Sequence, residues 1–420
     1  MTAAPAAPNL ADPLTLPCGT QLPNRLAKSA MTEGVADADN RATERHAVLY
    51  RRWSEGGTGL HITGNVQVDR RYLERPGNVV IEDREGLEQL RQYAVAGTVA
   101  GNQLWMQIGH AGRQTPIHVN PEPVAPSAVP LELPPGRHGD PRALRGDEVT
   151  DIVRRFAFVA EVARETGFTG AQVHAAHGYL ISEFLSPKAN RRDDEWGGNL
   201  ENRARLLLET MRAMRRAVGP DFALGVKLNS ADFQKDGFTF EECVQVVQWL
   251  EEAGCDLLEV SGGNYEQPSM MGARIKDEVA GNELPQRPVR ESTRRREAYF
   301  LEYADAMRKV TKMPLMVTGG FRSRAAMDAA LASGALDVVG IARPLCVDTD
   351  VSAGLLDGSV TAARSYETEI DPPQAGLAWF CWQILRLADG QDADLELDGK
   401  SAIKAYFEHE TKKAEAMNRG

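Results

Sequence analysis

Short apolar runs alternate with longer segments of helical spacing along most of this chain. The runs, rich in β-branched and other apolar residues, are 25–31, 59–65, 103–109, 170–176, 223–229, 255–261, 314–320 and 337–343. Apolar residues recur every three or four positions in segments that include 84–100, 148–166, 200–218, 239–254, 294–311 and 323–334. Strands that alternate with helices pair in parallel, and eight such units close into a barrel. The pattern therefore predicts an α/β fold, a (β/α)8 TIM barrel.

The segments outside this rhythm predict additions to the barrel. Residues 1–13, rich in Ala and Pro, are expected to form a poorly ordered arm. The barrel is assigned to 14–364 and begins with a β-hairpin in LTLPCGTQLPNRL. The tail, 365–420, is expected to form two helices outside the barrel. Its aromatic patch, Trp379, Phe380 and Trp382, could pack on its own barrel or reach a neighbouring subunit, and the first outcome is the more common.

Two insertions lengthen the loops on the side of the barrel where catalytic loops lie. Residues 110–146, rich in Pro and Gly, follow the third strand, and residues 262–293 follow the sixth. Long loops at this face commonly form lids over a binding site.

Composition narrows the function. The chain is 42% hydrophobic and 25% charged, which is ordinary for a globular protein, and its net charge of −11 disfavours nucleic acid or an anionic membrane as a partner. A small-molecule substrate is expected instead, with a homo-oligomer possible. Five cysteines without a CxxC pair favour reduced thiols, and neither a secretory signal nor an apolar run of about 18 residues is present. We therefore expect a cytoplasmic protein.

The ends of the seventh and eighth strands predict a phosphate site. Gly319 and Gly320 end one strand, and Ala342 and Arg343 end the next. Glycines let backbone N–H groups approach phosphate oxygens, and the loops after these two barrel strands often hold a phosphate. Tight turns and a structural ion pair of Arg343 are the alternative, but two such ends together favour phosphate.

The fourth strand runs into His174, His177 and Tyr179. Two histidines three residues apart could bind zinc, with Asp232 or Glu259 as a third ligand, although no known zinc motif supports this. Alternatively, both imidazoles donate hydrogen bonds to one substrate oxygen while Tyr179 supplies a proton. A single histidine would more often be a core residue, but this spacing at a strand end favours a functional role.

Other strand ends suggest a flat ligand with polar edges. Thr32 and Gln107 can make hydrogen bonds in the plane of a heterocycle, beside Met31. Gly64 leaves room for a ring, and Lys227 can stabilise negative charge at one edge. With the phosphate site, these residues suit flavin mononucleotide (FMN).

Several motifs resemble the old yellow enzyme family, the NADH:flavin oxidoreductase / NADH oxidase group. They are LPNRLAKSAMTEG, QIGHAGR, HAAHGYLISEFLSPKANRRDDEWGGNLENR, KLNSADF and TGGFRS, within residues 14–350. The resemblance implies noncovalent FMN, with NADH or NADPH as co-substrate. It places Ala30, Met31 and Thr32 along the isoalloxazine, with Gly64 and Gln107 at the ring edge. Lys227, often Arg in the family, would lie near N1 and O2, and Gly319, Gly320, Ala342 and Arg343 would hold the phosphate.

The resemblance also implies an activity. His174 and His177 would bind the substrate oxygen and Tyr179 would donate the proton in reduction of the C=C bond of α,β-unsaturated carbonyl or nitro compounds. Two alternatives remain at this point: an NADH oxidase that uses O₂, and a flavin-free lyase or aldolase with Lys227 as a Schiff-base lysine. In the longest motif, Arg191, Asp194, Glu195 and Arg203 are expected to form a structural charged brace.

Overall fold

The computed structural model describes residues 7–266 and 300–417. Within them, eight parallel strands form a closed barrel, since each pairs with the next, β14 pairs with β3, and β10 pairs with β7. This confirms the predicted fold, and each strand falls inside a predicted run. The barrel strands are β3 (Leu26–Lys28), β4 (Leu60–Ile62), β7 (Gln103–Gly109), β10 (Gly170–Ala175), β11 (Ala223–Asn229), β12 (Leu257–Ser261), β13 (Leu315–Thr318) and β14 (Val338–Ile341).

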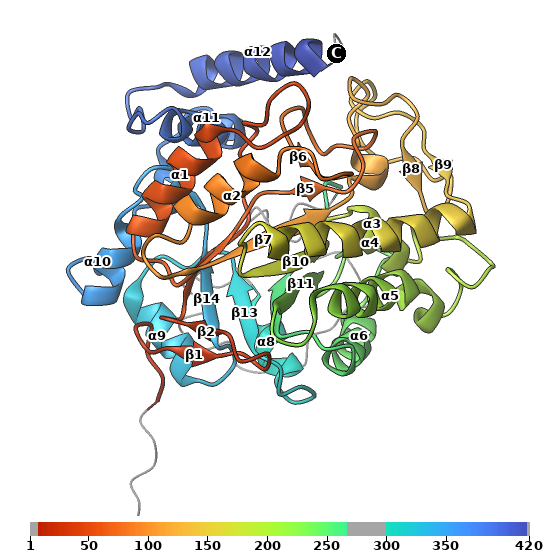
Figure 1. Cartoon of the computed structure of the whole chain (residues 1–420), viewed down its shortest axis with the longest axis horizontal. Coiled ribbons are helices and arrows are strands. Elements are labelled where there is room, and N and C mark those ends of the chain that lie inside the picture. Colours follow the sequence, from red (N-terminus) through yellow and green to blue (C-terminus); the bar gives the residue numbers. More distant parts are fainter. Residues whose placement is uncertain (1–6, 267–299, 418–420) are drawn as a thin grey trace, which may run out of the picture.

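Helices surround the barrel, as Figure 1 shows. α6 begins at Phe240 because Thr239 caps it, and Thr239 and Glu242 form a capping box at its first turn. Residues 294–299 of one predicted helix lie outside the described residues. The helices that follow the strands are α1 (Glu44–Glu55), α2 (Leu87–Ala96), α3 (Gly146–Glu165), α4 (Leu180–Leu185), α5 (Leu200–Val218), α6 (Phe240–Glu252), α8 (Leu301–Met307), α9 (Arg324–Ala332) and α10 (Val351–Asp357).

The predicted hairpin closes one end of the barrel. β1 (Leu14–Thr15) and β2 (Gln21–Leu22) pair antiparallel. Leu16 and Leu22 pack in one buried cluster with Trp105 and with residues at the starts of the strands, such as Leu257. The amino-terminal end of the barrel is therefore filled, which leaves the carboxyl-terminal strand ends to form a site.

The start of the chain and two added strands differ from the sequence prediction. The expected arm is wrong for residues 9–12, because they form a turn and Leu10 is fully buried, its N–H donating to Asp328 Oδ1 at 3.0 Å. Residues 1–6 of the arm lie outside the described residues. β5 (Val66–Gln67) and β6 (Val79–Val80), absent from the prediction, extend the sheet beyond β7.

The first insertion contributes little regular structure. Insertion 110–146 carries two short parallel strands, β8 (Val124–Ala125) and β9 (Arg142–Ala143). Of the second insertion, residues 262–266 are described, and 267–293 lie outside the described residues.

The tail packs on its own barrel. α11 (Gly376–Ala388) lies against α1, and α12 (Gly399–Met417) packs on α11, as the blue helices of Figure 1 show. Trp379 and Phe380 are buried in the main core, while Trp382 is partly buried against it. None of the helices in residues 7–266 and 300–417 combines the length and apolar character that crossing a bilayer requires.

Candidate active site

Most of the sequence-predicted site residues line one cavity of about 140 Å³ at the carboxyl-terminal strand ends. Gly64 lies just behind it, where its N–H donates to Glu33 Oε1 at 2.8 Å and an added Cβ would approach Met31 O at 2.6 Å. Glycine at position 64 therefore allows the backbone of Met31 and Thr32 to approach closely, because any side chain there would collide with it. The cavity is lined by Ala30, Met31, Thr32, Gln107, His174, His177, Tyr179 and Lys227, together with Asn65, Glu74, Arg75 and Tyr265.

The predicted phosphate residues line a second hollow of about 80 Å³, at the ends of β13 and β14. Gly319 and Gly320 have φ of +124° and +89°, which lets their backbone turn into the hollow. Ala342 and Arg343 lie on its other side, and Arg343 is within 3.7 Å of Glu367. Backbone groups with nearby arginines fit a phosphate, while the first cavity offers ring-edge groups, so the two hollows fit the two ends of FMN.

A buried hydrogen-bonded network, here called the barrel floor, lies in the barrel at the base of the first cavity. Its centre is Glu259, which is fully buried and 3.0 Å from Lys227 Nζ. Strand register explains the contact, because His174, Lys227 and Glu259 pair across β10, β11 and β12. The barrel floor comprises Ser29, Gln107, Gln172, Lys227, Glu259 and Thr318.

The network extends through hydrogen bonds to side chains on β7, β10 and β13 and to Ser29, which follows β3. Gln107 Nε2 donates to Gln172 Oε1 at 2.7 Å, and Gln172 Nε2 donates to Glu259 Oε2 at 2.8 Å. Thr318 Oγ1 donates to Glu259 Oε1 at 2.7 Å and lies 2.6 Å from Ser29 Oγ. Glu259, one of the candidate third zinc ligands, is thus occupied by the barrel floor.

The two histidines meet edge to face, with ring centres 5.1 Å apart. Burial, together with the charge of Lys227, lowers the pKa of both well below the usual value, so both rings are neutral at physiological pH. His174 Nδ1 accepts from Ala176 N–H at 3.3 Å, which places its proton on Nε2 as a donor. His177 has φ of +63°, and its Nε2 lies 2.7 Å from Ser261 Oγ. If Ser261 donates there, Nδ1–H of His177 is the second donor.

Tyr179 belongs to a second set of linked side chains, here called the rim chain, formed by Tyr179, Tyr265, Glu74, Arg75 and Tyr406. The hydroxyls of Tyr179 and Tyr265 are 2.8 Å apart, and Tyr265 OH lies 3.5 Å from Glu74 Oε1. Glu74 pairs with Arg75 at 2.8 Å, and Arg75 Nη1 donates to Tyr406 OH at 2.7 Å. Burial and the neighbouring Tyr265 and Glu74 raise the pKa of Tyr179 well above its usual value, so this hydroxyl stays protonated at neutral pH.

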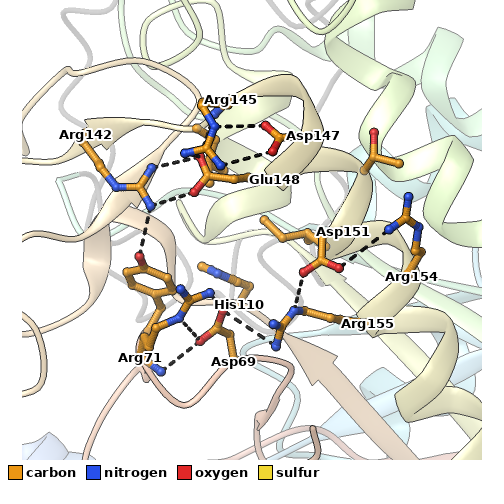
Figure 2. Close-up of a pocket in the computed structure, with 14 residues that line it drawn as sticks. Asp69, Arg71, His110, Arg142, Arg145, Asp147, Glu148, Asp151, Arg154 and Arg155 are labelled. Carbon is orange, nitrogen blue, oxygen red and sulfur yellow. Dashed lines mark hydrogen bonds and ion pairs between the residues drawn. The ribbon is translucent and has the colours of Figure 1, made fainter.

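A larger cavity of about 620 Å³ lies elsewhere, between the 69–72 loop and the start of α3 (Figure 2). Its lining consists largely of charged side chains that pair with one another. Arg142 binds Glu148 at 2.8 Å, and Arg155 binds Asp151 at 2.7 Å, as the dashed lines in Figure 2 show. These pairs satisfy the charges internally, so the smaller cavity at the strand ends is the stronger candidate site.

Comparison with known families agrees with this geometry. The profile of the NADH:flavin oxidoreductase / NADH oxidase family matches residues 9–358, which is most of the chain. This chain belongs to that family. It is an NAD(P)H-dependent flavin oxidoreductase, and FMN is its cofactor.

Individual relatives of this flavin oxidoreductase cover much of its length. It is 36% identical over 355 residues to the NADH-dependent flavin oxidoreductase iliE of Hypocrea jecorina (strain QM6a), over 80% of this chain and 86% of that protein. It is 37% identical over 358 residues, 80% of this chain, to iliE of Neonectria sp. (strain DH2), of which it spans 45%. The solved structure of an old yellow enzyme homologue from Zymomonas mobilis has a TM-score of 0.70 and 25% identity, over 86% of this chain and 96% of that one.

Sequence reasoning missed four residues of this flavoenzyme's cavity, namely Asn65, Glu74, Arg75 and Tyr265. Asn65 follows the recognised Gly64, so its position beside a strand end was a usable signal. Two members of the predicted charged brace pair with residues outside it. Asp194 pairs with Arg192 at 2.5 Å, and Arg203 pairs with Glu242.

Proposed function

We propose that this flavin oxidoreductase reduces the activated C=C bond of α,β-unsaturated carbonyl or nitro compounds, with Tyr179 as the proton donor. The observation that carries the proposal is the meeting of three side chains in one cavity. His174, His177 and Tyr179 lie around the same space, with Tyr179 and His174 ring centres 4.7 Å apart. This arrangement suits a substrate whose oxygen is held at one end while a carbon is protonated at the other.

The cofactor would be held by the residues of the two hollows. FMN, when bound, supplies hydride that originates from NADH or NADPH. Gln107 would contact the ring edge, Lys227 would lie near N1 and O2, and Thr32 would lie near O4. The phosphate would lie against Gly319, Gly320, Ala342 and Arg343, and Ala30 and Met31 would border the ring, with Gly64 behind them.

The histidines would polarise the substrate. A neutral imidazole donates one hydrogen bond, so His174 Nε2–H, and His177 Nδ1–H where Ser261 donates to Nε2, would bind one carbonyl or nitro oxygen. Two donors directed at the oxygen that gains charge lower the barrier for reduction of the conjugated bond. Tyr179 would then donate its proton to the α-carbon, and its raised pKa keeps that proton in place until it is needed.

Tyr179→Phe tests the proposal. In stopped-flow experiments, we expect the oxidation of reduced enzyme by cyclohexenone to slow by about 10²-fold, as for loss of a general acid. Flavin reduction by NADH should keep its rate, because that half-reaction needs no proton from Tyr179. An unchanged rate with cyclohexenone would reject Tyr179 as the acid. His174→Ala combined with His177→Ala should weaken binding of p-hydroxybenzaldehyde, and unchanged affinity would exclude the oxygen-binding role.

An NADH oxidase activity is a second candidate, because the matched family carries that description as well. Turnover of NADH with an enone in the absence of O₂ separates the two activities. The lyase alternative is disfavoured, because Lys227, its Schiff-base residue, is ion-paired with Glu259 inside the barrel.

A further inference from the structure

The rim chain joins the proposed proton donor to the tail of the protein. Tyr179 follows β10, Tyr265 follows β12, and the Glu74–Arg75 pair comes from the loop between β5 and β6. Arg75 then contacts Tyr406, on α12. Segments far apart in the sequence thus meet within one hydrogen-bonded chain, which ends at the substrate cavity.

Arg75 is held from two directions. Its Nε donates to both oxygens of Glu74, at 3.1 and 3.0 Å, and its Nη2 donates to Oε1 at 2.8 Å. Its Nη1 donates to Tyr406 OH at 2.7 Å and lies 3.4 Å from Cys381 Sγ, on α11. A planar guanidinium with acceptors on both sides has a fixed orientation, so the tail helices fix the Glu74 carboxylate as well.

Tyr265 lies between this fixed carboxylate and Tyr179. Its hydroxyl is 2.8 Å from Tyr179 OH, an ordinary O–H···O length, and 3.5 Å from Glu74, which is longer than ordinary. The bond between the two phenols is therefore the stronger one. Either hydroxyl can donate at rest, but once Tyr179 has lost its proton, only Tyr265 can.

We propose that Tyr265 is a positioning residue for the proton donor Tyr179, and that α11 and α12 hold it in place through Arg75 and Glu74. This inference rests on the proposed role of Tyr179. It assigns the tail a part in the substrate half of the reaction.

The proton balance is simple. The O–H bond of Tyr179 breaks as the new C–H bond forms at the substrate α-carbon, which leaves the charge on the Tyr179 oxygen. Tyr265 donates a hydrogen bond to that oxygen and keeps its own proton. Water then returns a proton to Tyr179, so both tyrosines end neutral. A hydrogen bond to a charged oxygen contributes more than one between neutral groups, and its loss is expected to slow the step about tenfold.

A double-mutant cycle tests this coupling. Tyr265→Phe should slow oxidation of the reduced holoenzyme by cyclohexenone about tenfold, and leave both FMN content and flavin reduction by NADH unchanged. Adding Tyr265→Phe to Tyr179→Phe should cause no further loss, because the group that Tyr265 serves has gone. Separate losses that multiply, or a wild-type rate for Tyr265→Phe, would overturn the proposal.

The tail is tested by Tyr406→Phe, which removes one hydrogen bond to Arg75 at a distance from the substrate. We expect a loss of about two- to threefold in the same half-reaction alone. Tyr303→Phe is the control, because Tyr303 is a buried tyrosine on α8 outside the cavity, and its rates should match the wild type. Equal rates for Tyr406→Phe and wild type would show that the tail helices do not contribute to the positioning of Tyr265.

The outcome for Tyr179→Phe separates the two levels of inference. If that variant is slow while Tyr265→Phe is not, the proposed function stands and the positioning role fails. If Tyr179→Phe reduces cyclohexenone at the wild-type rate, the proposed function fails, and any effect of Tyr265→Phe would have to arise from a role other than positioning Tyr179.

Discussion

The barrel floor and the rim chain are two polar networks beside one cavity, and they are built differently. The barrel floor consists of side chains on neighbouring strands, whose register places Lys227 opposite Glu259. The rim chain is assembled from loops and a tail helix, and one of its bonds joins residues 331 positions apart, Arg75 and Tyr406. Strand register fixes the side of the cavity proposed for the flavin, whereas loops and tail fix the side of the proposed proton donor, so the second can change while the first is kept.

The largest expected effect on stability comes from removing the charge at the centre of the barrel floor. Glu259→Gln leaves the Lys227 charge buried without its partner, and loss of one member of a buried pair costs about 3–5 kcal/mol. We therefore expect the free energy of unfolding of the FMN-free protein, measured in urea, to fall by about that amount. Glu85→Gln is the control, because Glu85 pairs with Arg41 at the surface and its loss should cost less than about 1 kcal/mol. Equal losses for the two variants would contradict a rigid, buried barrel floor.

A buried histidine on a barrel strand should make the free energy of unfolding fall in acid. His61, on β4, is fully buried, and burial, reinforced by the charge of Lys28, lowers its pKa to about 3. The unfolded chain takes up a proton below its ordinary pKa of 6.5, and the folded chain does not, so this histidine lowers stability as the pH falls from 6.5 towards 3. At about 1.4 kcal/mol per pH unit, the loss reaches about 2 kcal/mol at pH 5.

His61→Leu should remove this contribution. The difference in the free energy of unfolding between pH 7 and pH 5 should shrink by about 2 kcal/mol in urea titrations of the variant. His118→Leu, at an exposed position in the 110–146 insertion, should change that difference less. A difference that His61→Leu leaves unaltered would show that His61 is protonated in the folded protein.

A smaller effect is expected where the barrel floor meets the second hollow, which Thr318, Gly319 and Gly340 line. An added Cβ at Gly340 would lie 2.0 Å from Thr318 Oγ1 and 2.7 Å from Ser29 Oγ, so Gly340→Ala must separate these two hydroxyls. We expect a loss of stability of about 1–3 kcal/mol and weaker FMN retention, measured by recovery of flavin fluorescence on dilution. Gly376→Ala is the control, because no atom lies within 4 Å of an added Cβ there. Unchanged FMN retention in Gly340→Ala would show that FMN binding does not depend on the contact between Thr318 and Ser29.

The same contrast explains which parts of the site could be predicted from the sequence. Barrel strands have a strong hydrophobic pattern, and parallel pairing brings their carboxyl ends together, so His174, Gln107 and Lys227 could be assigned to one site in advance. Tyr265 and Arg75 lie in loops without periodicity, and no local signal connects them with Tyr179 or with Tyr406. The Lys227–Glu259 pair was also missed, although both were noted, because the relative register of two strands is not encoded in either strand alone.

The tail offers a test with the opposite dependence on pH. Burial raises the pKa of Glu410, on α12, to about 7 from an ordinary value of 4.5, with Arg75 and Glu74 among the nearby charges. Between those two values the folded protein binds the proton more tightly than the unfolded chain, so the stability contributed by this group falls as the pH rises from 4.5 through 7.

Glu410→Gln removes that loss. It should stabilise the protein by about 1 kcal/mol at pH 8, a value reduced for partial exposure, and hardly at pH 5. Glu408→Gln, at a more exposed position on α12, should be neutral at both. Urea titrations at the two pH values would then show that acid lowers the stability contributed by His61 and that base lowers the stability contributed by Glu410. An equal effect of Glu410→Gln at both pH values would show that the Glu410 carboxyl is exposed to water, away from the rim chain.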